Sequence, residues 1–169
     1  GPFIMARQAE IVREHVADAV ARGAKIEHGG RIIERGGVWS EVTVLSGVTH
    51  EMKIMTEETF GPVIPVMPYD TLEEAIALAN FGDYGLSANV LAGSEDEAMA
   101  IARRLDAGFV SINEISMSSF VLDYEWEPSR FSGLGRARMG VTGIARYLRI
   151  KAIVTSRNPV GDVAAMHDL

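Results

Sequence analysis

Apolar residues recur every three or four positions between Arg7 and Arg22, a spacing that places them on one face of a helix. The recurring positions are Ile11, Val12, His15, Val16, Ala19 and Val20. Gly23 follows, where a helix commonly ends in a left-handed residue. The pattern therefore predicts a helix over residues 7–22 that buries one face.

Two pairs of glycines then bracket a short β-type segment. Gly29-Gly30 and Gly36-Gly37 enclose two isoleucines, which indicates a hairpin. A run of β-forming residues follows at 42–45, and an apolar strand is predicted at 63–67. We expect the residues between those strands to form a short helical or irregular passage.

Two capping boxes predict where the next helices begin. Thr71 with Glu74, and Ser94 with Glu97, each place a hydroxyl at the N-cap and a carboxylate three residues later. The apolar spacing continues the first helix to about Asn80 and the second to about residue 106.

Apolar strands are predicted at residues 86–91 and 108–112, so strands and helices alternate with short connections. This order predicts parallel strands with right-handed crossovers and helices covering the sheet, which is an α/β sandwich. Residues 113–140 are irregular, and loops of that length are usually functional. We expect a helix at 141–148 and a last strand at 150–154.

Composition limits the function further. The 169 residues suffice for one compact domain, and 47% of them are hydrophobic. A net charge of -7 argues against a nucleic-acid partner, and no apolar run reaches the roughly 18 residues of a membrane span. The chain has no cysteine, which excludes disulfides and a cysteine nucleophile within it. A cytoplasmic protein is the expectation.

Residues 57–63, which we call the signature segment, carry the strongest candidate chemistry. Glu58 can hold a sugar diol through charge-assisted hydrogen bonds, and Phe60 can pack its ring against a flat heterocycle. Gly61-Pro62 can fix the turn that aims both. The alternative is a solvated loop carboxylate beside a Gly-Pro turn.

The signature segment resembles the Glu-x-Phe-Gly-Pro motif of the aldehyde dehydrogenase superfamily. Further segments that resemble this family follow in the same order: Tyr84-Gly85-Leu86-Ser87-Ala88, Asp106-Ala107-Gly108-Phe109-Val110-Ser111-Ile112-Asn113, Ser132-Gly133-Leu134-Gly135-Arg136, and Tyr147 with Lys151. The resemblance extends to about residue 155 and matches the C-terminal part of the family. It implies a partial catalytic domain over residues 1–148 and an oligomerisation strand with a tail over residues 149–169.

The resemblance also implies a fold and site residues. The fold would be a three-layer α/β/α sandwich with a mainly parallel sheet. Glu58 would bind the ribose beside the nicotinamide of NAD or NADP, and Phe60 would pack near the nicotinamide ring. Asn113, Phe120 and Trp126 would help to wall the aldehyde pocket.

The family oxidises aldehydes to carboxylates with a catalytic cysteine and a glutamate base that lie upstream of the matched part. This chain would therefore contribute no catalytic residue, and we expect it to be inactive alone and to form a homo-oligomer. The alternative is a noncatalytic assembly or regulatory module with the same fold. Glu125 to Pro128 replaces the family's Pro-Phe-Gly-Gly, which places Trp126 at the aromatic position.

Other candidate sites are weaker. The Gly-x-Gly at residues 133–135 lacks both a preceding strand and the third glycine of a dinucleotide fingerprint. Asp123, Glu125 and Glu127 are interpreted as a charged loop rather than an acid–base pair. The four histidines have no metal-ligand spacing, so we expect no metal site.

Overall fold

The computed structural model describes residues 2–115, 117, 120–121, 123–136 and 140–155. Its helices are α1 (Ala6–Ala21), α2 (Lys53–Thr56), α3 (Leu72–Ala79), α4 (Glu95–Ala102) and the 3-10 helix η2 (Gly140–Tyr147). Its strands are β1 (Lys25–His28), β2 (Ile32–Glu34), β3 (Val38–Ser40), β4 (Thr43–Ser46), β5 (Val63–Val66), β6 (Tyr84–Gly85), β7 (Ser87–Val90), β8 (Phe109–Ile112) and β9 (Ser129–Arg130).

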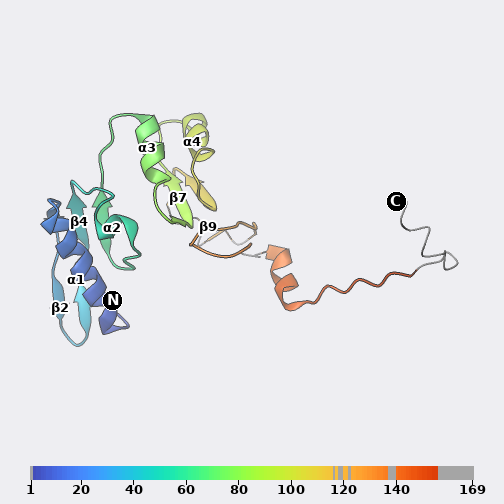
Figure 1. Ribbon diagram of the computed structural model, residues 1–169, viewed down its shortest axis with the longest axis horizontal. Coiled ribbons are helices and arrows are strands. Elements are labelled where there is room, and N and C mark those ends of the chain that lie inside the picture. The colour runs from blue at the N-terminus through green and yellow to red at the C-terminus, as the bar shows by residue number, and fades with distance from the viewer. Residues whose placement is uncertain (1, 116, 118–119, 122, 137–139, 156–169) are drawn as a thin grey trace, which may run out of the picture.

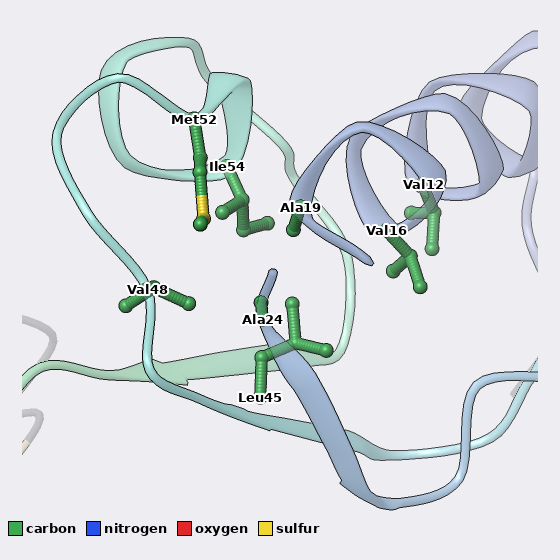
Figure 2. Close-up of a cluster of buried hydrophobic side chains, with 8 residues drawn as sticks. All are labelled: Val12, Val16, Ala19, Ala24, Leu45, Val48, Met52 and Ile54. Carbon is green, nitrogen blue, oxygen red and sulfur yellow. The ribbon is translucent and has the colours of Figure 1, made fainter. Parts of the chain in front are cut away.

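The first half of the chain folds around α1, the helix predicted from the apolar spacing. Gly23 follows its end with φ of 105°, as expected of the residue that stops the helix. Buried side chains from α1, α2, β4 and the loops between them form one apolar cluster (Figure 2). Its members are Val12, Val16, Ala19, Ala24, Leu45, Val48, Met52 and Ile54. This cluster fixes α1 against the sheet of β1, β4 and β5, and the signature segment runs into β5.

The predicted hairpin is present as β2 and β3. The two strands pair antiparallel, with Ile33 opposite Trp39. Gly36 and Gly37 both have positive φ at the turn, which glycine adopts without the steric cost of a Cβ. The glycine pair is therefore explained by the turn that it makes.

Both predicted capping boxes begin helices in the second half of the chain. The backbone N–H of Glu74 donates to Thr71 Oγ1 at 3.2 Å, and that of Glu97 donates to Ser94 Oγ at 3.2 Å. α4 ends at Ala102, earlier than predicted. The chain tightens there into a turn, because the Arg104 N–H donates to the carbonyl of Ile101 three residues back.

Strand pairing confirms the α/β class, with mixed sheets. β4 pairs parallel with β5 and β7 pairs parallel with β8, while the β1–β4, β2–β3 and β6–β9 pairs are antiparallel. Within the described residues the strands form four small sheets rather than one mainly parallel sheet. In Figure 1, α1, α2 and their sheet lie in one part of the molecule, and α3, α4 and β7 lie in the next.

The C-terminal region differs from the pattern predicted for it. Residues 140–147 form the 3-10 helix η2 instead of an ordinary α-helix. The strand predicted at 150–154 is wrong for this chain: these residues have no regular secondary structure, because no described strand pairs with them. They run away from the folded part in Figure 1. Residues 156–169 of the predicted oligomerisation segment lie outside the described residues.

Candidate functional site

The signature segment lies against one face of α1. Gln8, Val12 and His15 are spaced four and three residues apart, so they share that face, which we call the anchor face. Gln8 Nε2 donates to the carbonyl oxygen of Thr59, and His15 Nδ1 lies 2.9 Å from Thr59 Oγ1. A Cβ placed on Gly61 would lie only 2.3 Å from Val12 Cγ2. The helix therefore holds the segment at close range.

Alternate residues of the signature segment face in different directions. Glu57, Thr59 and Gly61 contact the anchor face, although Glu57 is also exposed, whereas the exposed Glu58 and Phe60 make no described contact with it. The segment then enters β5, where the N–H of Thr43 donates to the carbonyl of Pro62 at 2.8 Å. This arrangement fixes the backbone and leaves two side chains of predicted function turned outward.

The two exposed side chains, Phe60 and Glu58, are those predicted to contact the cofactor. Phe60 is 79% exposed with φ of 47°, and its ring presents an open apolar surface. Glu58 makes no side-chain hydrogen bond or ion pair within the described part of the chain, so its oxygens remain acceptors for ribose hydroxyls. An acceptor carboxylate beside an open ring could hold a sugar diol next to a planar ring.

Asn113, predicted to lie at the substrate mouth, follows β8 directly. Its φ is 53°, and its N–H donates to the carbonyl of Val90 at 2.8 Å. Its Oδ1 accepts the N–H of Ala92, also at 2.8 Å. Asn113 therefore ties the end of β8 to the end of β7 with both backbone and side chain.

Trp126 and Phe120, the other two predicted substrate residues, lie in the irregular region after β8. Trp126 is half-buried, and its ring meets Phe109 edge-on with centroids 6.0 Å apart. The indole Nε1 is buried and has no acceptor among the residues that the structure describes. Phe120 is exposed. Trp126 also lines a small pocket with Glu125, Glu127 and Arg136.

The structure does not bring the two predicted groups of site residues into contact. No described hydrogen bond, ion pair or ring contact joins Glu58 or Phe60 to Asn113, Phe120 or Trp126. Within the described residues, no group of three or more His, Asp or Glu side chains could hold a metal ion.

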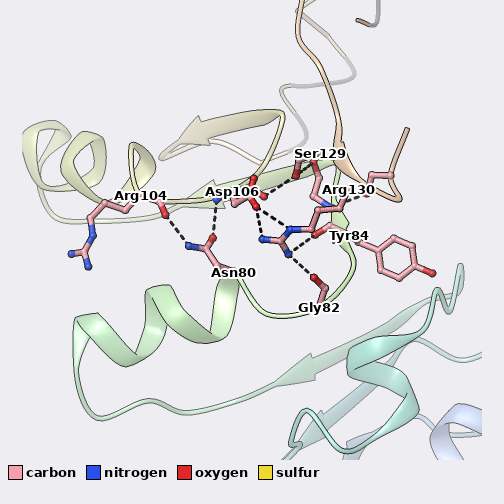
Figure 3. A network of polar contacts seen from close by, with 9 residues as sticks. Asn80, Gly82, Tyr84, Arg104, Asp106, Ser129 and Arg130 are labelled. Atoms are coloured by element: carbon pink, nitrogen blue, oxygen red, sulfur yellow. Dashed lines mark hydrogen bonds and ion pairs between the residues drawn. The ribbon is translucent and has the colours of Figure 1, made fainter. Parts of the chain in front are cut away.

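A polar network around Arg130 was not predicted from the sequence (Figure 3). Arg130 Nε and Nη2 donate to Asp106 Oδ2 at 2.9 and 2.6 Å, and its Nη1 donates to the Gly82 carbonyl at 2.6 Å. These bonds hold the pKa of the Asp106 carboxyl below its usual value. Arg130 has φ of 55°, so this side chain is held at a residue in the left-handed region.

The network joins three loops that are far apart in the sequence. Asn80 Nδ2 donates to the carbonyl of Arg104, and Asn80 Oδ1 accepts the N–H of Asp106, both at 2.8 Å. A Cβ on Gly108 would lie 2.1 Å from the carbonyl oxygen of Glu127. The glycine at 108 was the available signal, since an isolated glycine at the start of a strand often marks close backbone approach.

Comparison with known protein families identifies the class of this protein. The model of the aldehyde dehydrogenase family matches residues 1–153. The chain belongs to the aldehyde dehydrogenase family, as the motifs predicted.

Individual relatives agree with that assignment. The chain is 42% identical to a putative succinate-semialdehyde dehydrogenase [NADP(+)] of Mycolicibacterium smegmatis over 93% of its own length. It superposes on the putative aldehyde dehydrogenase PutA of Anabaena variabilis with a TM-score of 0.88, 48% identity and 96% of the chain covered. Betaine aldehyde dehydrogenase of Staphylococcus aureus in complex with NAD+ gives a TM-score of 0.84 with 34% identity, covering 94% of the chain.

The chain is much shorter than these relatives. It spans 31% of the Mycolicibacterium smegmatis protein, 35% of the Anabaena variabilis chain and 32% of the Staphylococcus aureus chain. Among the described helices, none is both long enough and apolar enough to cross a membrane.

Proposed function

We propose that this chain is the C-terminal part of an NAD(P)-dependent aldehyde dehydrogenase that oxidises an aldehyde to a carboxylate. The observation that carries the proposal is the outward-facing pair of Glu58 and Phe60 on a segment held by α1. Family membership and coverage of about a third of the relatives' length support it. The catalytic cysteine and the general base would lie in sequence outside this chain, which contains no cysteine.

Glu58 and Phe60 would hold the nicotinamide half of the cofactor. The Glu58 carboxylate accepts hydrogen bonds from ribose hydroxyls, and the Phe60 ring packs beside the nicotinamide. Bound NAD or NADP supplies the hydride acceptor for the oxidation. The two residues position that group and take no part in making or breaking bonds.

Asn113, Phe120 and Trp126 would form part of the aldehyde pocket. Trp126 brings a wide aromatic surface to the wall, and the backbone of Asn113 is fixed at the junction of β7 and β8. Residues from the rest of the complete enzyme would close the pocket and bring the cofactor and substrate sides together. Two of the relatives named above are named for succinate semialdehyde and for betaine aldehyde, which supports a small aldehyde as substrate.

Substitution of Glu58 in the complete enzyme tests the cofactor assignment. Glu58→Gln keeps the shape but removes the charge, and a charge-assisted hydrogen bond contributes about 1.5–3 kcal/mol. We expect cofactor affinity or the hydride-transfer rate to fall by about tenfold or more. Glu51→Gln, at an exposed carboxylate before α2, is the matched control. Unchanged affinity and hydride transfer in Glu58→Gln would contradict the assignment.

A noncatalytic assembly or regulatory module is the second candidate function. It is favoured by the exposed apolar side chains of the C-terminal region, such as Ile150, Ile153 and Val154. Under either function we propose a cytoplasmic homo-oligomer without a nucleic-acid or membrane partner, in keeping with the net charge of -7. A purified 169-residue chain that reduced NAD with an aldehyde would contradict the predicted inactivity of the chain alone.

A further inference from the structure

We infer that His15 is a positioning residue for the cofactor contact: through Thr59 and Glu57 it fixes the backbone that aims Glu58 and Phe60. The inference rests on the proposed function, because it assigns Glu58 and Phe60 to the cofactor. It concerns a buried imidazole that belongs to neither predicted group of site residues.

His15 uses both ring nitrogens on the signature segment. Its side chain is 3% exposed, Nδ1 lies 2.9 Å from Thr59 Oγ1, and Nε2 lies 3.4 Å from Glu57 Oε2. These two partners flank Glu58 on either side. The Thr59 hydroxyl can donate to Nδ1, which leaves Nε2 facing the Glu57 carboxylate.

The anchor face fixes the segment at further points. Gln8 donates to the carbonyl of Thr59, so Thr59 is held through both its side chain and its backbone. Gly61 lies so close to Val12 that no side chain fits between them. The segment thus meets α1 at every second residue, through the Glu57 side chain, through both parts of Thr59 and through the Gly61 backbone.

Phe60 shows why such fixing matters. Its φ of 47° lies in the left-handed region, which costs a residue with a Cβ on the order of 1–2 kcal/mol. A conformation of this kind persists only where the surroundings determine it. The neighbours of Phe60 on both sides, Thr59 and Gly61, are the residues that α1 holds. Without the anchor, we expect the segment to relax and the Phe60 ring to turn away.

A loosened segment would affect cofactor and aldehyde differently. Glu58 would remain present and charged but would sample several directions, which weakens its hydrogen bonds and misplaces the nicotinamide. The aldehyde wall would be unchanged, since Asn113 and Trp126 make no described contact with α1. The expected result is weaker cofactor binding and slower hydride transfer, with an unchanged KM for the aldehyde.

The test compares variants of the complete enzyme by calorimetric titration with NAD+ and NADP+ and by amide hydrogen exchange over residues 57–63. In His15→Leu we expect a cofactor Kd about fivefold higher, as for loss of one neutral hydrogen bond, and faster exchange at Phe60. His15→Asn, whose amide can replace Nδ1 beside Thr59, is expected to restore part of the affinity. Hydride transfer and the KM for the aldehyde are measured in parallel.

Val16→Ala is the matched control. Val16 is buried on the next position of α1 but belongs to the apolar cluster rather than the anchor face. It should lower stability while leaving the cofactor Kd and the exchange at residues 57–61 unchanged. If His15→Leu behaves in the same way, the role of His15 is only structural and the inference is overturned.

One further variant, Thr59→Val, together with Glu58→Gln keeps the outcomes separate. Thr59→Val removes the hydroxyl while keeping His15, and should reproduce the rise in Kd even if His15→Leu fails to fold. An unchanged Kd and unchanged exchange in Thr59→Val would overturn the inference. If Glu58→Gln weakens cofactor binding and the His15 and Thr59 variants do not, only the inference fails. If Glu58→Gln also has no effect, the proposed cofactor role fails with it.

Discussion

At the scale of single residues, Gly61 illustrates how closely the signature segment is packed on α1. An added Cβ would lie 2.3 Å from Val12 Cγ2, and Val12 is itself buried. We therefore expect Gly61→Ala to lower the free energy of unfolding by about 1–3 kcal/mol, the usual cost of overpacking. Urea denaturation followed by circular dichroism measures the change.

Gly93→Ala is the control for that prediction. Nothing lies within 4 Å of a Cβ built on Gly93, so its stability should be close to that of the wild type. An equal loss in both variants would show that the loss of glycine itself, rather than the contact with Val12, causes the effect.

The residue types of Glu58 and Phe60 made them candidate cofactor contacts in the sequence, and both are exposed in the structure. It could not predict that Phe60, Asn113 and Arg130 all have positive φ. Thr59, next to Phe60, contacts His15 on α1. Asn113 bonds to the residues after β7, and Arg130 bonds to Asp106, so each position is held by residues distant in the sequence. Such contacts leave no local pattern.

At the scale of elements, the N-caps of α3 and α4 predict separable effects on stability. Thr71→Ala removes the oxygen that accepts the Glu74 N–H, and loss of such a cap costs about 1 kcal/mol. We expect a lower urea midpoint with an unchanged m-value. Thr71→Ser keeps the hydroxyl and should behave like the wild type, so a loss in Thr71→Ser would argue against the cap as the cause.

The Asp106–Arg130 pair predicts a dependence of stability on pH. Because Arg130 lowers the pKa of Asp106 in the folded state, the pair stabilises the fold fully above the ordinary carboxyl pKa. That contribution is lost as the pH falls through the lowered pKa. Asp106→Asn should therefore lose less stability than the wild type between neutral and strongly acidic pH, measured by urea denaturation at each pH.

Other carboxyls, including Asp18 and Glu73, also have lowered pKa values and contribute to acid denaturation. For this reason the test of the pair is the difference in pH-dependent stability between the wild type and Asp106→Asn, not the profile of the wild type alone. Identical pH profiles would mean that the Asp106–Arg130 contact adds nothing to folding in solution.

The capping boxes and the spacing of apolar residues predicted α1, α3 and the start of α4, because those signals lie within a few residues of each helix end. The end of α4 and the strand β9 were not predicted. β9 has only two residues and exists through its pairing with Tyr84 and Gly85. A strand that short has no periodicity to detect.

At the scale of the whole molecule, exposed apolar side chains predict self-association. Leu148, Ile150, Ile153 and Val154 are all exposed in the described C-terminal region. Such a surface favours association with another chain. We expect a dimer or larger species of the 169-residue chain in sedimentation velocity, and replacing Ile150 and Ile153 with Lys should shift it toward the monomer. A strictly monomeric wild-type chain would contradict the prediction.

The α/β class followed from the alternation of strands and helices, and the structure confirms it. The division into several small sheets was not predictable, because sequence patterns indicate that a strand exists but not which strand lies beside it. β5 shows the difference: its apolar run was evident, yet within the described residues it pairs with β4 alone.

The alternation of anchored and exposed residues in the signature segment has a consequence for how this family can vary. A substitution at position 58 or 60 changes what is presented to the cofactor and leaves the contacts of Thr59 and Gly61 with α1 in place. An insertion or deletion of one residue between them would change which side chains meet α1 and which face solvent. Related chains should therefore keep the length of this segment unchanged.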